Sequence, residues 1–158
     1  MILSTAEQFA KLWAATHNTP PPVGTIDAEA LNSEIADLPS TGGVIELGAG
    51  SHATGSGLAI ITKPGLTLRG QGVGVTELTI NHASNHLLDF IGGNPDWFTL
   101  ENLTLRQLHA SGSGLALRMI GTQPGTYIRS PTVRNVECSG FLKSILVDGA
   151  LEVELAHI

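Results

Sequence analysis

Three charged residues occupy matching places in three similar apolar segments, and they are the best candidates for chemistry in this chain. Asp89 lies in HLLDFIG, Arg118 in GLALRMIG and Asp148 in SILVDG, at intervals of about 30 residues. If the three segments are neighbouring strands, the charges form one column on an outer face. Two carboxylates beside one substrate can act as the acid and base of a glycoside hydrolase. Alternating charges on neighbouring strands can equally form a ladder that only stabilises the fold.

Two ring side chains are predicted to lie on turns that flank these strands, namely Trp97 and His109. Trp97 can stack on a sugar ring or fill the turn NPDWF, and we expect it to fill the turn. His82 and His86 are four residues apart, but NHASNH has the pattern of a polar turn and not of a helix. We therefore expect no metal site there, and no metal or cofactor elsewhere.

The glycine-rich stretch LTLRGQGVGVTELTI (66–80) is a second place where a ligand could bind. Gly70, Gly72 and Gly74 follow a short apolar strand at alternate positions. Their spacing matches neither common phosphate-binding pattern, and no lysine lies among them. A strand pattern follows, whereas a phosphate site of this kind uses the N-terminus of a helix. We expect these glycines to form a tight corner.

The composition indicates one domain of short strands joined by tight turns. The chain has 158 residues, of which 19 are glycine, while charged residues make up 14% and aromatic residues 4%. The net charge of −6 argues against nucleic acid and anionic lipid as partners. No apolar run is long enough to span a membrane, and MILSTAEQFAKLWAATH lacks the features of a signal peptide. The single cysteine, Cys138, excludes a disulfide within the chain.

Two helices are predicted before the strands begin. Ser4 and Glu7 form a capping box, which starts an N-terminal helical arm over residues 1–18. Residues 19–26 include three consecutive prolines and form a stiff linker. A second helix follows over residues 27–38. The arm either packs on its own domain or docks on a partner.

Beyond the second helix, similar strands return about every 30 residues. FTLENLTL (98–105), PTVRNVEC (131–138) and LEVELAHI (151–158) align so that their apolar positions coincide. A chain that returns to the same register stacks like residues on like, in strands about 4.8 Å apart. The pattern therefore predicts an all-β fold, a parallel β-solenoid.

Polar residues support this alignment. Four charged residues share one outward position and alternate in sign: Arg69, Glu101, Arg134 and Glu154. Opposite charges on neighbouring parallel strands attract, although each exposed pair contributes at most about 1 kcal/mol. Asn102 and Asn135 also coincide, and we expect them at a sharp bend because asparagine tolerates a left-handed conformation.

Taken together, these segments resemble the pectate-lyase-like right-handed β-helix superfamily. The resemblance is carried by the second helix with LPSTGGVIELGAGSHAT, by LTLRGQGVGVTELTI and by FTLENLTLRQL, and it covers about residues 27–158. It implies a right-handed parallel β-helix with an N-terminal capping helix and a preceding helical arm. The superfamily holds lyases, hydrolases, epimerases, adhesins and virus tailspikes, so the resemblance is specific for fold rather than activity.

The resemblance also implies where a substrate would lie, along the outside of the sheet formed by HLLDF, LALRM and ILVD. Asp89, Arg118 and Asp148 are then the catalytic candidates, and Trp97 and His109 flank them as candidates for ligand binding. The two carboxylates would be about 9–10 Å apart at the backbone, at the long end for an inverting hydrolase. Arg118 could instead hold a uronate or act as the base of a lyase. We favour a charge ladder over a site.

The sequence favours a virion protein, a phage tailspike or receptor-binding β-helix located in the virion tail. Expected partners are other virion proteins through residues 1–18, a surface polysaccharide, and further copies of the chain, most simply in a trimer. The alternative is a polysaccharide lyase, hydrolase or epimerase of the same fold in the cytoplasm, and a third reading is a structural solenoid without ligand. We expect no glycan turnover, since about four rungs span only about 15 Å.

Overall fold

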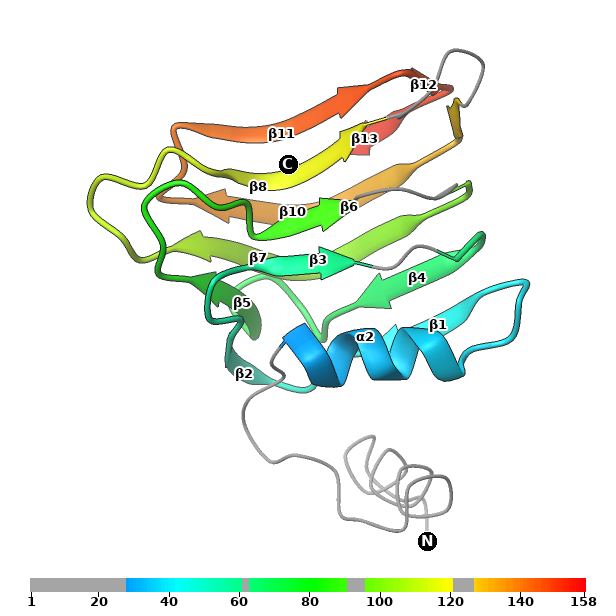
Figure 1. Ribbon diagram of the computed structural model, residues 1–158, viewed down its shortest axis with the longest axis horizontal. Helices are drawn as coiled ribbons and strands as arrows, with labels where there is room; N and C mark the ends of the chain where they lie inside the picture. The colour runs from blue at the N-terminus through cyan, green and yellow to red at the C-terminus, as the bar shows by residue number, and fades with distance from the viewer. Residues whose placement is uncertain (1–27, 61–62, 91–95, 121–126) are drawn as a thin grey trace, which may run out of the picture.

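A computed structural model of the chain describes residues 28–60, 63–90, 96–120 and 127–158 (Figure 1). The predicted helical arm (1–18) and the linker (19–26) lie outside the described residues. The described part contains one helix, α2 (Ala28–Asp37), and otherwise short strands. The strands are β1 (Gly43–Glu46), β2 (Gly50–Ala53), β3 (Leu58–Ile60), β4 (Leu66–Arg69), β5 (Thr76–Ile80), β6 (Leu88–Phe90), β7 (Thr99–Gln107), β8 (Leu115–Ile120), β9 (Ile128–Arg129), β10 (Thr132–Ser139), β11 (Lys143–Asp148), β12 (Ala150–Leu151) and β13 (Glu154–Ala156).

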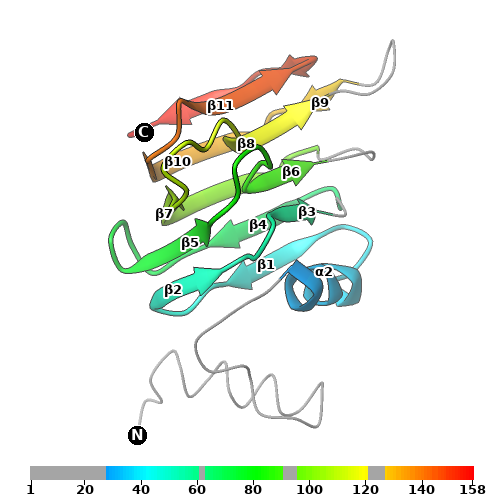
Figure 2. The ribbon, with the colours of Figure 1, turned by 60° about the vertical axis from the view of Figure 1, so that its left-hand side comes forward.

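The strands form two main sheets in which every pairing is parallel. One sheet has the order β1-β4-β7-β10-β13, with β2 beside β5 and β5 beside β7, and the other has the order β11-β8-β6-β3. A small third sheet pairs β12 with β9. The chain alternates between the two main sheets, and we call one passage through both a repeat. Successive repeats lie on top of one another (Figures 1 and 2), so the predicted all-β chain with parallel pairing is confirmed.

The alternation of apolar and polar residues explains how each strand is oriented. In β6 the side chains of Leu88 and Phe90 are buried, whereas Asp89 between them is half-buried. Their partners on β8, Leu117 and Met119, are fully buried. Because each strand presents one apolar face, both sheets turn these faces toward a shared core.

Helix α2 contributes to the same core at the β1 end of the stack (Figure 2). Leu31 and Ile35 lie one helical turn apart on its apolar face, and both are fully buried. The ammonium group of Lys63 donates hydrogen bonds to the carbonyl oxygens of Ala36 and Leu38 at the end of the helix. These contacts satisfy two backbone acceptors that a helix C-terminus leaves free.

The predicted charge ladder is confirmed for Arg69, Glu101 and Arg134, but it continues to Glu46 and does not include Glu154. Glu46 pairs with Arg69, Arg69 with Glu101, and Glu101 with Arg134. Glu154, predicted to follow Arg134, instead lies opposite Thr132. The alignment of the last strand was wrong by two residues. Such a shift leaves every side chain on the same face, so the alternation of apolar and polar residues cannot detect it.

The chain turns with a left-handed residue at the same place in successive repeats. Asn102 and Asn135 have φ values of 59° and 51°, and the amide of Asn135 donates to Asn102 Oδ1 at 2.7 Å. This confirms the predicted bend. The predicted glycine corner is confirmed as well, because Gly70 follows β4 and Gly72 and Gly74 belong to the turn before β5. A side chain at Gly70 would overlap the carbonyl oxygen of Asn102, 2.3 Å from the Cβ position.

The bend leads to a first prediction. Asn102→Ala should lower the free energy of unfolding by about 0.5–1 kcal/mol more than Asn102→Gly, because only alanine is strained in the left-handed region. Both variants lose the amide bond to Asn135, so their difference isolates the backbone conformation. Urea denaturation of the two variants measures it, and equal losses of stability would contradict the prediction.

Candidate functional site

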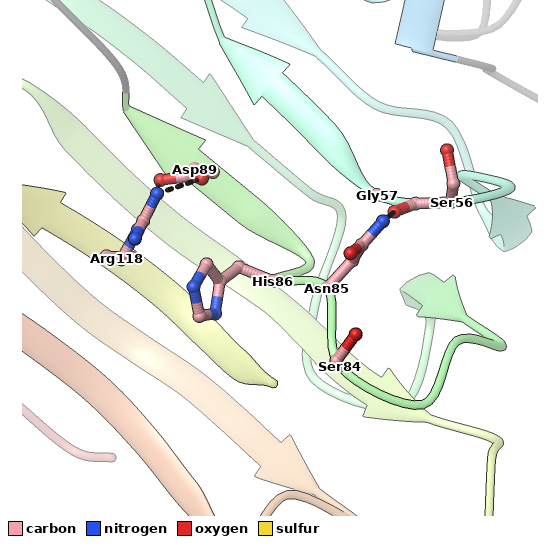
Figure 3. A pocket seen from close by; sticks show the side chains of 7 residues that line it. All are labelled: Ser56, Gly57, Ser84, Asn85, His86, Asp89 and Arg118. Atoms are coloured by element: carbon pink, nitrogen blue, oxygen red, sulfur yellow. Dashed lines mark hydrogen bonds and ion pairs between the residues drawn. The ribbon is translucent and has the colours of Figure 1, made fainter. Parts of the chain in front are cut away.

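The site lies on the outer face of the sheet that contains β3, β6 and β8, near the points where these strands begin. It is a pocket of about 400 Å³. Its lining comes from three successive repeats: Ser56, Gly57, Ser84, Asn85, His86, Asp89 and Arg118 (Figure 3). Most of these groups are hydroxyl, amide or imidazole groups, which can donate and accept hydrogen bonds.

Asp89 and Arg118 form the charged wall of the pocket. They lie directly opposite each other on β6 and β8. Arg118 Nε donates to Asp89 Oδ1 at 2.7 Å and Nη2 donates to Oδ2 at 2.6 Å, so the pair is bidentate (Figure 3). The side chain of Arg118 is 30% exposed and that of Asp89 is 13% exposed. The hydrogen bond to Asp89 raises the pKa of Arg118 above its ordinary value, so the guanidinium keeps its proton.

His86 lies beside this pair, and its ring is oriented by the backbone. The Leu115 N–H donates to His86 Nδ1 at 2.9 Å. An imidazole nitrogen that accepts a hydrogen bond carries no proton, so in the neutral ring the proton is on Nε2. Burial lowers the pKa of His86 below its ordinary value of 6.5, and the charge of Arg118 lowers it further, against the opposing effect of Asp89. His86 is therefore a neutral donor at neutral pH.

Two glycines from the neighbouring repeats hold the Asn85–His86 backbone in place. A Cβ at Gly57 would lie 2.2 Å from the carbonyl oxygen of His86, and a Cβ at Gly114 would lie 1.9 Å from that of Asn85. No side chain fits at either distance. The wall of the pocket therefore depends on glycine on both sides of this segment.

Asp148 does not belong to the column that the sequence predicted. Arg118 lies opposite Leu146, and Asp148 lies opposite Ile120. Asp148 is thus two strands across and two residues along from Asp89, which separates them by about 12 Å at the backbone. Inverting hydrolases hold their two carboxyl groups roughly 6.5–9.5 Å apart and retaining ones closer. The run Ile145-Leu146-Val147 is apolar throughout, so it did not indicate which register was correct.

The two predicted flanking residues lie outside the pocket lining. Trp97 is in the turn before β7 and is 55% exposed, so the expectation that it fills this turn was wrong. The next residue, Phe98, packs in the core instead, since it is fully buried and its ring centre lies 4.4 Å from that of Phe90. His109 is in the turn after β7, where its Nδ1 accepts from the Ser111 N–H at 3.3 Å.

Trp97 also has a left-handed backbone, with a φ of 57°. The strand pairings align one residue of each other repeat with Trp97. All of these residues also have a left-handed φ: Gly42, Gly65, Ser130 and Glu152. The corner requires this conformation, whichever residue is present. The strain at Trp97 thus follows from the fold and is not itself a sign of function.

Sequence reasoning missed the role of Ser84, Asn85 and His86. The segment NHASNH has the pattern of a polar turn, and the spacing of its histidines indicated nothing beyond a possible metal site. Its position directly before a strand that carries Asp89 was the signal that could have found it. No group of three or more His, Cys, Asp or Glu side chains in the described part of the chain is arranged to hold a metal ion.

The position of His86 predicts a dependence of stability on pH. Because its pKa is lowered in the folded state, the unfolded chain binds more protons once the pH falls below about 6.5, and the folded state loses stability. His86→Asn keeps a hydrogen-bond acceptor but does not titrate. The loss of stability between pH 7 and pH 5 should therefore be smaller in this variant than in the wild type. Thermal unfolding across this range measures it, and identical pH profiles would contradict the assignment.

Comparisons with protein families, curated proteins and solved structures found no match to this chain. The resemblance noted in the sequence therefore stays a prediction. Among the described residues, no helix has the length and apolar character needed to cross a membrane.

Proposed function

We propose that this chain is a right-handed parallel β-helix of the pectate-lyase-like type that binds a surface polysaccharide without cleaving it. The parallel pairing of like strands in successive repeats supports the fold. A pocket lined by hydroxyl, amide and imidazole groups supports a hydroxyl-rich ligand, because sugars offer the same mixture of donors and acceptors.

Binding without cleavage is inferred from the carboxylates of the pocket. Among the described residues that line the pocket, Asp89 is the single carboxylate, and both of its oxygens accept hydrogen bonds from Arg118. A general acid must present a proton to the leaving group, whereas both oxygens of Asp89 face N–H donors of Arg118. With Asp148 about 12 Å away, no acid and base face each other across the pocket.

A lyase of the same fold is the alternative, and it needs only a base. Arg118 is a poor base because its pKa is raised by its hydrogen bond to Asp89. The unprotonated nitrogen of His86 is also occupied, since it accepts the Leu115 N–H. Neither group lining the pocket is therefore ready to remove a proton from a sugar.

The proposed setting is a virion tailspike or receptor-binding protein, and its support is the resemblance in the sequence. Self-association, most simply as a trimer, is proposed from large apolar side chains exposed on the last repeat: Leu142, Leu146, Leu155 and Ile158. Light scattering at micromolar concentration tests this, and a monomer would contradict it.

A panel of immobilised glycans tests the proposed binding. Ser84→Leu should abolish binding because it fills the pocket from an exposed position on its rim. Ser111→Leu makes the same change in the exposed turn between β7 and β8, outside the pocket lining, and should leave binding intact. Failure of the wild type to bind any glycan, or equal binding by both variants, would refute the proposed function.

A further inference from the structure

The Asp89–Arg118 pair has hydrogen-bonding capacity left over on both sides. A guanidinium has five N–H groups and a carboxylate accepts about four hydrogen bonds, whereas within the described part of the chain the pair uses two of each. The exposed edge of the pair therefore presents unused N–H groups beside unused carboxylate lone pairs. A hydroxyl group is both a donor and an acceptor. Two adjacent hydroxyls of a sugar can thus meet this edge, one donating to Asp89 and the other accepting from Arg118.

The rest of the pocket carries no net charge. Ser56, Ser84 and Asn85 are neutral, and His86 is neutral because its Nδ1 accepts the Leu115 N–H. The charges of Asp89 and Arg118 cancel within the pair. Since the whole chain has a net charge of −6, its long-range field repels anions.

A sugar acid would be bound less well than a neutral sugar. Its carboxylate would have to compete with Asp89 for the guanidinium of Arg118, and would come to rest beside a second negative charge. The bidentate geometry at 2.7 and 2.6 Å makes this exchange unfavourable, because both bonds are charge-assisted.

The geometry points to a neutral sugar with two adjacent hydroxyl groups as the ligand of this pocket, with uronates excluded by the Asp89–Arg118 pair. This inference rests on the proposed function and adds the class of glycan. The pair acts as the element that determines specificity, and not as a catalytic couple.

The test compares neutral oligosaccharides of glucose, galactose, mannose and rhamnose with galacturonate and glucuronate oligosaccharides of equal length. The wild type should bind at least one neutral member about tenfold more tightly than any uronate, as expected from a hydrogen bond to a charged group. Asp89→Asn should weaken neutral binding by a similar factor and strengthen uronate binding, because Arg118 becomes available to an anion. Asp148→Asn, which removes the same charge from an exposed position outside the pocket, should change neither Kd.

The outcomes separate the inference from the function on which it rests. Preference of the wild type for uronates would overturn the inference and leave glycan binding at this site intact. Unchanged neutral binding in a folded Asp89→Asn variant would also overturn it. If that variant does not fold, the preference of the wild type decides alone, together with deoxy sugars that lack one of the two hydroxyls and should bind about tenfold more weakly. Absence of binding to every glycan would refute the proposed function itself.

Discussion

Replacing Glu101 with glutamine should lower the free energy of unfolding by about 3 kcal/mol, more than any other single charge in the stack. The Glu101 side chain is only 3% exposed, and it accepts hydrogen bonds from Arg69 and Arg134, each at 2.5 Å. Burial raises its pKa, but the hydrogen bonds from the two arginines outweigh burial, so the pKa is lowered overall. Glutamine keeps the shape, but its single oxygen can accept from only one of the two arginines, and its NH2 group faces the donor of the other. The arginines are 40% and 56% exposed, so water can solvate them, which keeps the cost below that of a fully buried pair.

Glu46→Gln is the matched control on the same ladder. Its side chain is 47% exposed and lies 3.4 Å from Arg69, so its loss should cost no more than about 0.5 kcal/mol. The difference between the two variants should shrink as the pH falls below 4.5, because the stabilisation by Glu101 is lost as it is protonated. Urea denaturation measures both. Equal effects of the two substitutions would show that the burial of Glu101 does not increase its contribution to the free energy of unfolding.

Gly114→Ala should cost about 3 kcal/mol and remove glycan binding. The new Cβ would lie 1.9 Å from the carbonyl oxygen of Asn85 and 3.3 Å from the nitrogen of His86. Both atoms belong to the backbone, which cannot swing aside as a flexible side chain can. The segment that carries Asn85 and His86 must therefore move, and the pocket changes shape with it.

Gly48→Ala provides the comparison for this substitution. Gly48 has no heavy atom within 4 Å of its Cβ position, and its φ is outside the left-handed region. Its replacement should change stability by less than about 0.5 kcal/mol and leave binding intact. Urea denaturation and the glycan panel are applied to both variants. Normal stability and binding in Gly114→Ala would contradict the close packing described for this wall.

The repeat was predictable because stacking places like residues together over long intervals. Leu100 and Val133, aligned from the sequence, are partners in the structure, and so are Asp89 and Arg118. The two errors in strand alignment, at Asp148 and Glu154, are both shifts of two residues near the end of the stack. There the number of residues in each turn sets the register, and hydrophobic alternation carries no information about it.

The site was predictable only in part, because it is formed by turns. Asp89 and Arg118 lie on strands, where periodicity places them. Ser84, Asn85 and His86 reach the pocket because Gly57 and Gly114 allow their backbone to approach the neighbouring repeats. Such close contacts depend on the stacking of whole repeats, and no local pattern indicates them.

Binding without cleavage is tested by the mass of a neutral oligosaccharide recovered after incubation with the wild-type protein, at concentrations above the Kd. The oligosaccharide should bind and be recovered intact, because no acid and base face each other in the pocket. Shorter products, hydrolysed or unsaturated, that disappear in a folded Arg118→Ala variant would contradict it and make the Asp89–Arg118 pair part of a catalytic site.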